Sequence, residues 1–118
     1  MNTDKRTIFL CSATVPTNQY EDIKTFLGCE LSKVFGGATI YKGNGFWSEN
    51  GEDNLERYSD NIEQRTVLIT HLSVITDLEE RALQTLKSTF KKINEAFNLN
   101  NTHIHVEKIS SLARHISI

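Results

Sequence analysis

Apolar and polar residues change their spacing several times along the chain, and each change marks a predicted element. Residues 6–15 place apolar side chains on both faces of an extended segment, which is typical of a central strand. Residues 38–47, 65–72 and 103–109 also have the pattern of strands. Between these strands, two stretches repeat apolar residues at spacings of three and four, which predicts two amphipathic helices.

Each predicted helix has one apolar stripe and recognisable end signals. The first stripe consists of Tyr20, Ile23, Leu27, Leu31 and Val34, and the second of Leu83, Leu86, Phe90, Ile93 and Phe97. Asn18 with Glu21, and Thr76 with Glu79, have the spacing of capping boxes at the two helix starts. Gly36 and Gly37 are expected to end the first helix, because glycine readily adopts the left-handed conformation there.

The predicted order of elements is β-α-β-β-α-β. It indicates an α+β, ferredoxin-like sandwich in which residues 1–118 form a single domain, with two helices on one face of a four-stranded antiparallel sheet. The opposite face of the sheet is expected to lie open. Because a second subunit commonly closes such a face, we expect a homo-oligomer, either a dimer or a trimer.

Composition narrows the classes of function. The 118 residues carry a net charge of −2, and no run of basic residues is longer than Lys91-Lys92, which disfavours a nucleic-acid partner. No segment approaches the roughly 20 apolar residues of a membrane span, and no apolar stretch resembles a secretory signal. Cys11 and Cys29 lack the spacing of a metal site or a redox motif. A cytoplasmic protein with two free thiols is therefore expected.

Residues 48–64 have no apolar period and hold six carboxylates against one basic residue, Arg57. This stretch is expected to be a long acidic loop with part of a hairpin in it. Two interpretations remain open: a solvated connection, or a loop that contacts a protein partner. In the second, apolar anchors and steering carboxylates would share the contact: Glu52, Asp53, Leu55, Glu56 and Tyr58.

Residues 35–47 read Phe-Gly-Gly-Ala-Thr-Ile-Tyr-Lys-Gly-Asn-Gly-Phe-Trp. This segment resembles the second strand of PII-like signalling proteins, and a set of small bacterial proteins has the same Gly-Gly-Ala-Thr…Gly-x-Trp stretch. The resemblance implies a homotrimer of β-α-β-β-α-β subunits that binds adenine or cyclic nucleotides in clefts between subunits. It also implies that the long loop after the second strand engages a protein partner.

The glycine-rich segment itself has two interpretations. Glycines let backbone N–H groups approach an anion, which makes the segment a candidate ligand site: Gly36, Gly37, Thr39, Tyr41, Gly43, Gly45 and Trp47. The alternative is structural. Gly36 and Gly37 would then only cap a helix, and Gly43 and Gly45 would form a bulge under Trp47.

His103 and His105 would share one face of a strand, and His71 on a neighbouring strand could complete a set of metal ligands. Imidazoles on an open sheet face are more often simply solvated, so this trio is a weak metal candidate. No catalytic residues are predicted, because no nucleophile has a recognisable base and orienting group nearby. No cofactor is expected.

The sequence therefore favours a non-enzymatic, homo-oligomeric binding or regulatory protein. It would sense a small anionic ligand such as a nucleotide and contact a protein partner through residues 48–64. One alternative is a protein-interaction module or inhibitor without a small ligand. Another is a small enzyme that uses the histidines of the open sheet face.

Overall fold

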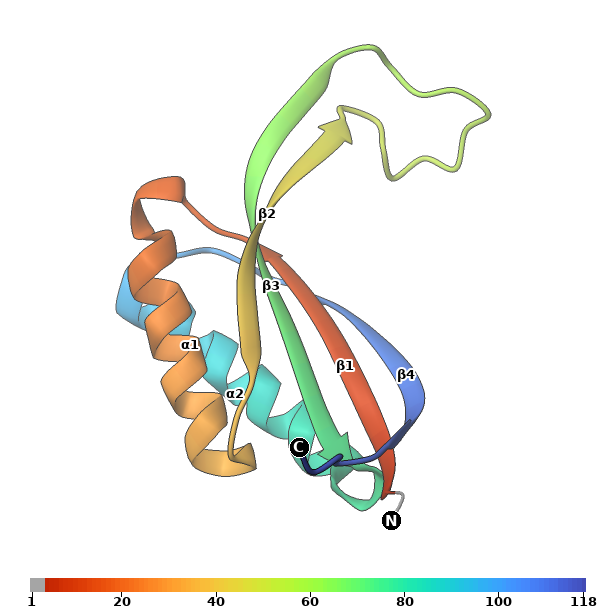
Figure 1. The fold of residues 1–118 in the computed structure, drawn as a ribbon. Coiled ribbons are helices and arrows are strands. Elements are labelled where there is room, and N and C mark those ends of the chain that lie inside the picture. The colour runs from red at the N-terminus through yellow and green to blue at the C-terminus, as the bar shows by residue number, and fades with distance from the viewer. Residues whose placement is uncertain (1–3) are drawn as a thin grey trace.

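Four antiparallel strands form one sheet, and two helices cover one of its faces (Figure 1). The computed structural model describes residues 4–118. The elements follow in the order β1 (Asp4–Thr14), α1 (Tyr20–Phe35), β2 (Thr39–Ser48), β3 (Ile62–Ile75), α2 (Glu79–Phe97) and β4 (His105–Ala113). The strands lie in the order β2-β3-β1-β4, so the ferredoxin-like α+β arrangement predicted from the sequence is confirmed.

The core lies between the sheet and the helices and follows the alternation of the two central strands. In β1, Phe9, Cys11 and Ala13 are buried, while the residues between them are only half-buried. In β3, Leu68 and Leu72 point to the same side. Because β1 and β3 are neighbours in the sheet, these residues form one continuous apolar layer under the helices.

The helix stripes agree with the predicted ones except at one residue. Leu83 was expected in the core, but 38% of its surface is exposed. The centre of the α2 stripe instead runs through Ala82, Leu86 and Ile93, which are fully buried. Leu83 lies one residue beyond that line, at the margin of the stripe, because successive helical residues are rotated by about 100°.

Gly36 ends α1 in the left-handed conformation with φ 84°, as predicted. The two predicted capping boxes are wrong. A single turn of 3₁₀-helix precedes each α-helix, at Thr17–Gln19 and Thr76–Leu78, and no side chain caps either helix. Glu79 instead accepts a hydrogen bond from the hydroxyl of Thr7 in β1 and pairs with Lys108 of β4 at 3.2 Å. These contacts lower the pKa of the Glu79 carboxyl.

Two buried threonines differ in how their hydroxyls are satisfied, and this difference can be tested. Among residues 4–118, Thr70 Oγ1 is the buried side-chain polar atom without a partner. We expect Thr70→Val to stabilise the protein by about 1 kcal/mol, because the nearly isosteric valine removes an unpaired hydroxyl from the core. Midpoints of urea unfolding measure the change.

The matched control is Thr7→Val, which makes the same chemical change at another buried threonine. Thr7 is 1% exposed, but its hydroxyl donates to Glu79. This variant should lower the free energy of unfolding, because Glu79 loses one of its two side-chain donors. Equal changes in the two variants would contradict the assignment of Thr70 as the unpaired group.

Candidate functional site

The first residues of β3 extend beyond the end of β1, so only β2 pairs with them. Its pairing with β1 ends at Thr14 opposite Val67, whereas its pairing with β2 continues to Ser48 opposite Ile62. Residues 45–48 and 62–65 therefore form a two-stranded ribbon with no third strand beside it. We call this part the ribbon, and the connection at its tip, residues 49–61, the acidic loop. Figure 1 shows both standing clear of the sheet and helices.

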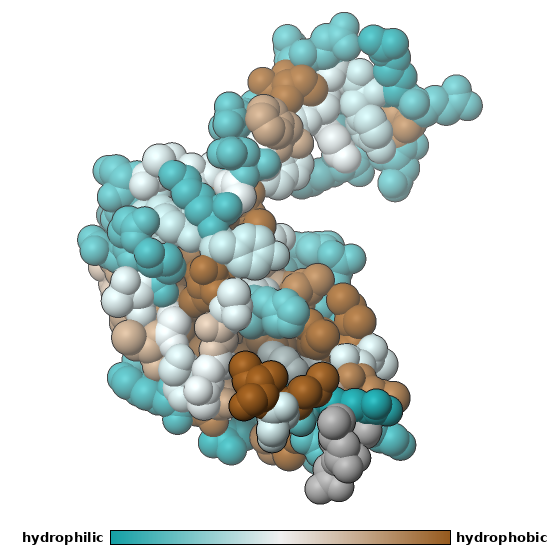
Figure 2. All heavy atoms as spheres, viewed as in Figure 1, coloured by the Kyte–Doolittle hydropathy of each residue, from teal (hydrophilic) through white to brown (hydrophobic). Residues whose placement is uncertain are grey.

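The overall dimensions reflect this projection. The radius of gyration is 16.3 Å, whereas a compact chain of this length has about 13.5 Å. In Figure 2 the ribbon and loop rise above the body and are largely hydrophilic, while apolar surface gathers over the body where the strands lie. The predicted loop of residues 48–64 is thus shorter by a few residues at its ends, which belong to β2 and β3.

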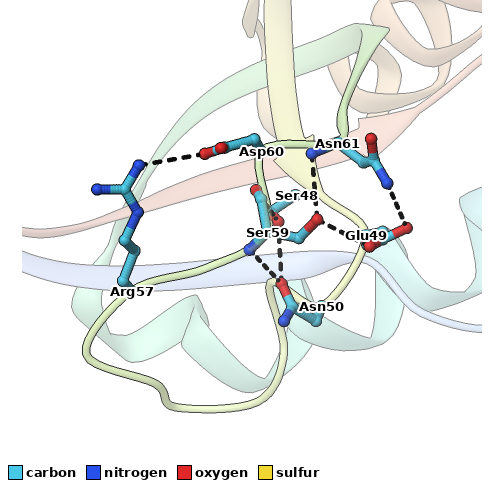
Figure 3. Close-up of polar contacts among 7 residues, drawn as sticks. All are labelled: Ser48, Glu49, Asn50, Arg57, Ser59, Asp60 and Asn61. Atoms are coloured by element: carbon cyan, nitrogen blue, oxygen red, sulfur yellow. Dashed lines mark hydrogen bonds and ion pairs between the residues drawn. The ribbon is translucent and has the colours of Figure 1, made fainter.

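The acidic loop is held by its own polar side chains (Figure 3). Ser48 donates from its hydroxyl to the carbonyl oxygen of Ser59 at 2.7 Å, and the Ser59 N–H donates to Asn50 Oδ1 at 2.9 Å. Glu49 accepts from the Ser59 hydroxyl at 2.7 Å and from Asn61 Nδ2 at 3.1 Å. These two hydrogen bonds lower the pKa of the Glu49 carboxyl, Ser59 contributing more. The loop therefore has a defined frame although no core supports it.

Outside this frame, the predicted partner residues face solvent. Glu52, Asp53 and Glu56 are exposed, and their carboxylates make no hydrogen bond or ion pair with the described residues. Leu55 and Tyr58 expose 47% and 38% of their surfaces, and the Leu55 N–H donates to the Tyr58 hydroxyl at 3.3 Å. The tip of the ribbon thus presents two apolar side chains among unpaired carboxylates.

Gly45 of β2 makes room for an indole ring. β2 and β3 pair residue for residue from Thr39 opposite His71 to Ser48 opposite Ile62, so the bulge expected at Gly43 and Gly45 is absent from this pairing. A Cβ atom on Gly45 would lie 2.0 Å from the ring of Trp47. The guanidinium of Arg65, which stands opposite Gly45, lies 5.5 Å from the centre of the same ring.

The predicted ligand residues fall on the open face of the sheet. Thr39, Tyr41, Gly43, Gly45 and Trp47 share one side of β2, since alternate residues of a strand face the same way. Four of these residues, all but Thr39, line a hollow of about 330 Å³ together with His105 and Glu107 of β4. Gly36 and Gly37 lie at the end of α1 and do not line it.

The other side of the same strand lines a larger cleft at the root of the ribbon. Its volume is about 730 Å³, and its lining residues include Lys42 and Asn44 of β2, Arg65 of β3 and Asn101. The one carboxylate among its lining residues, Glu63, is paired with Arg65 at 2.7 Å. The sequence analysis did not identify Lys42 and Asn44 as candidate ligand residues. They alternate along β2 with the candidates Tyr41, Gly43 and Gly45, so the two-residue period of a strand places them on the opposite face of the sheet.

The three histidines that were weak metal candidates do not come together. His103 lies before the start of β4, so it does not share a strand face with His105. His71 and His105 belong to β3 and β4, which β1 separates, and adjacent strands are about 4.8 Å apart. Within residues 4–118, no group of three potential metal ligands occurs. His105 instead lies 3.4 Å from Glu107 on its own strand.

Neither thiol forms a disulfide, as expected. Burial raises the pKa of the Cys11 thiol to about 11, so this side chain stays protonated at neutral pH and packs as an apolar group. Neither helix in the described part of the chain combines the length and apolarity that crossing a membrane requires.

The sequence matches no family model and no curated protein. Among the solved structures that match, two are the following. A Bacillus cereus protein related to NIF3 has 8% identity and a TM-score of 0.48 over 98% of this chain, which spans only 27% of that protein. CutA from Synechococcus elongatus has 6% identity and a TM-score of 0.46 over 93% of this chain and 80% of its own.

The contact between Gly45 and Trp47 can be tested with the intrinsic fluorescence of Trp47, the one tryptophan of the sequence. We expect Gly45→Ala to shift its emission to longer wavelength, because the new methyl group displaces the indole into solvent. The midpoint of unfolding should fall as well, because the new methyl group would also lie 2.8 Å from Cγ2 of the buried Val67. Gly37→Ala is the control, because no atom lies within 4 Å of its Cβ position. An unchanged Gly45→Ala spectrum would contradict the stacking.

Proposed function

We propose that this protein is a non-enzymatic, homo-oligomeric binding or regulatory protein that contacts a protein partner through the acidic loop. The observation that carries the proposal is the ribbon, which holds a loop with its own hydrogen-bonded frame away from the sheet and helices. A projection of this kind contributes little to the core. Surface loops placed by a rigid scaffold are frequent sites of recognition.

The composition of the loop tip suits a protein surface of opposite charge. Leu55 and Tyr58 are available as apolar anchors, and Glu52, Asp53 and Glu56 are available for pairing. Because the frame around Glu49 and Ser59 already orders the loop, binding loses less conformational entropy than it would with a disordered segment. A basic partner surface with an apolar pocket therefore fits this tip.

A small anionic ligand such as a nucleotide is the second part of the proposal. The segment predicted to bind it, residues 37–47, contributes Lys42 and Asn44 to the cleft at the root of the ribbon. A ligand there would touch β2, β3 and the segment that leads into β4. Binding would then restrain the ribbon against the body, so occupancy of the cleft could be communicated to the acidic loop.

Self-association is the third part, and the open face of the sheet supports it. Tyr41, Trp47, Ile75 and Ile109 on this face each expose at least 40% of their surfaces. Apolar side chains gathered on one side of a sheet favour burial against another molecule. We propose that a second copy covers them in the cytoplasm, where both thiols would stay reduced.

Cross-linking from the loop tests the partner contact. A photoreactive residue at position 58 should capture a protein in cells of the source organism, because the Tyr58 side chain is exposed at the loop tip. Adding Glu52→Gln, Asp53→Asn and Glu56→Gln should lower the yield several-fold, since the attraction between the charges is lost. The products are identified by mass spectrometry.

The matched control places the photoreactive residue at position 25, on the exposed side of α1. Capture of the same proteins from positions 25 and 58, or of none from position 58, would rule out a partner contact at the loop.

Charge on the open face tests self-association. Ile109→Lys should convert the oligomer to monomers, because a lysine would then have to be buried in the interface. Leu112→Lys is the control, since Leu112 is exposed on the same strand but faces the opposite side. Native mass spectrometry measures both. Dissociation by both variants, or by neither, would contradict an interface on the open face.

The same spectra distinguish the two non-enzymatic functions. A small anion retained by the gently purified protein supports the ligand cleft. If no small molecule is bound, the function that remains is that of a protein-interaction module that needs no small ligand.

A further inference from the structure

An apolar groove lies between α2 and the segment that leads into β4. Its volume is about 300 Å³, and its floor is formed by Leu83, Leu86, Phe90, Ile104 and Val106. Leu83 is the residue that the sequence predicted to be in the core and that the structure leaves 38% exposed. The groove is therefore a gap at the margin of the core, where the α2 stripe extends beyond what the edge strand β4 covers.

The rim of this groove is basic. Lys87 and Lys91 lie one turn apart on α2, and His103 stands across from them on the segment before β4. No carboxylate lines the groove. Both lysines are exposed, and the ammonium group of neither has a hydrogen bond or an ion pair with the described residues. The positive charge on this side of α2 is thus not neutralised within the molecule.

The acidic loop has the complementary features. It projects apolar side chains at Leu55 and Tyr58, whereas the groove is hollow and apolar. It carries unpaired carboxylates at Glu52, Asp53 and Glu56, whereas the groove carries unpaired ammonium groups. The net charge of −2 conceals this separation of the two signs. Charges of opposite sign around an apolar contact favour a specific docking geometry.

We propose that the acidic loop of one copy docks in the α2 groove of a second copy. Leu55 or Tyr58 would cover Leu83 and Phe90, and the loop carboxylates would face Lys87 and Lys91. The loop of the same molecule does not occupy the groove, because the ribbon carries the loop away from the helices (Figure 1). This inference rests on the proposed function, since it names a partner of the same loop.

Docking of this kind joins two different surfaces, so each copy retains one free loop and one free groove. Such heterologous contacts build rings or open chains rather than closed two-fold dimers. The attraction acts near the surface, where salt screens charges over about 8 Å at physiological ionic strength. The association should therefore weaken as salt rises. Any other protein that binds the loop would compete with it.

Charge reversal on each side tests the docking in the full-length protein. Lys87→Glu with Lys91→Glu makes the groove acidic, and Glu52→Lys, Asp53→Lys and Glu56→Lys make the loop basic. Each variant alone should lose the salt-sensitive association of the wild type, with the association constant at least about tenfold lower. Sedimentation velocity at low and physiological salt measures it over a range of concentrations.

Mixing the two variants provides the decisive result. The loop of the first then meets the groove of the second with wild-type charges, and the reversed surfaces also match. We expect the mixture to regain the salt-sensitive association, although neither variant shows it alone. Arg81→Glu with Lys92→Glu is the matched control, because it makes the same charge change on α2 outside the groove and should leave the association intact.

Three results would overturn the docking: a wild type without salt-sensitive association, reversed variants that associate like the wild type, or a mixture that fails to associate. These results are independent of cross-linking from position 58. If position 58 captures a different protein and the charge reversals have no effect on association, the proposed function is supported and docking between two copies is ruled out.

Discussion

The unequal length of β3 and its neighbours governs the shape of the molecule. β3 has 14 residues, but its pairing with the inner strand β1 begins only at Val67, whereas β2 pairs with it from Ile62 onward. A strand that is paired on one side only still satisfies half of its backbone groups, so the ribbon holds its form beyond the sheet. The loop at its tip is thereby placed far from the core, and the cleft at its root lies where β1 ends and the segment after α2 returns.

The loop compensates for the lack of core support by satisfying its own polar groups. Asn50 accepts from the Ser59 N–H, and Glu49 accepts from two donors on the returning segment. These contacts join the two ends of the loop and leave the carboxylates of the middle part unpaired. One carboxylate of the loop, that of Glu49, therefore stabilises the frame, while the others face solvent.

Charge is distributed over the molecule in a similar way. Negative groups collect on the loop, while two unpaired lysines border the apolar groove on α2. The open face of the sheet exposes apolar side chains on β2, β3 and β4 among polar ones such as His105 and Glu107. Three surfaces of different chemistry therefore lie in different places on the fold: the tip of the acidic loop, the groove beside α2 and the open face of the sheet.

The sequence by itself determined the elements, their order and the first helix with its glycine cap. Local signals are sufficient for these features, because apolar periodicity and the conformational freedom of Gly36 act within a few residues. Most of the candidate ligand strand and loop tip could also be named from the sequence, since Trp47, Leu55 and Tyr58 stand out from polar neighbours.

The tertiary structure decided which other residues these side chains contact. It placed the indole of Trp47 over Gly45, brought Lys42 and Asn101 to one cleft, left His103 outside β4 and exposed Leu83 at the edge of the core. These outcomes depend on strand register, strand length and the rotation of α2 about its axis, which long-range packing fixes and no local pattern specifies.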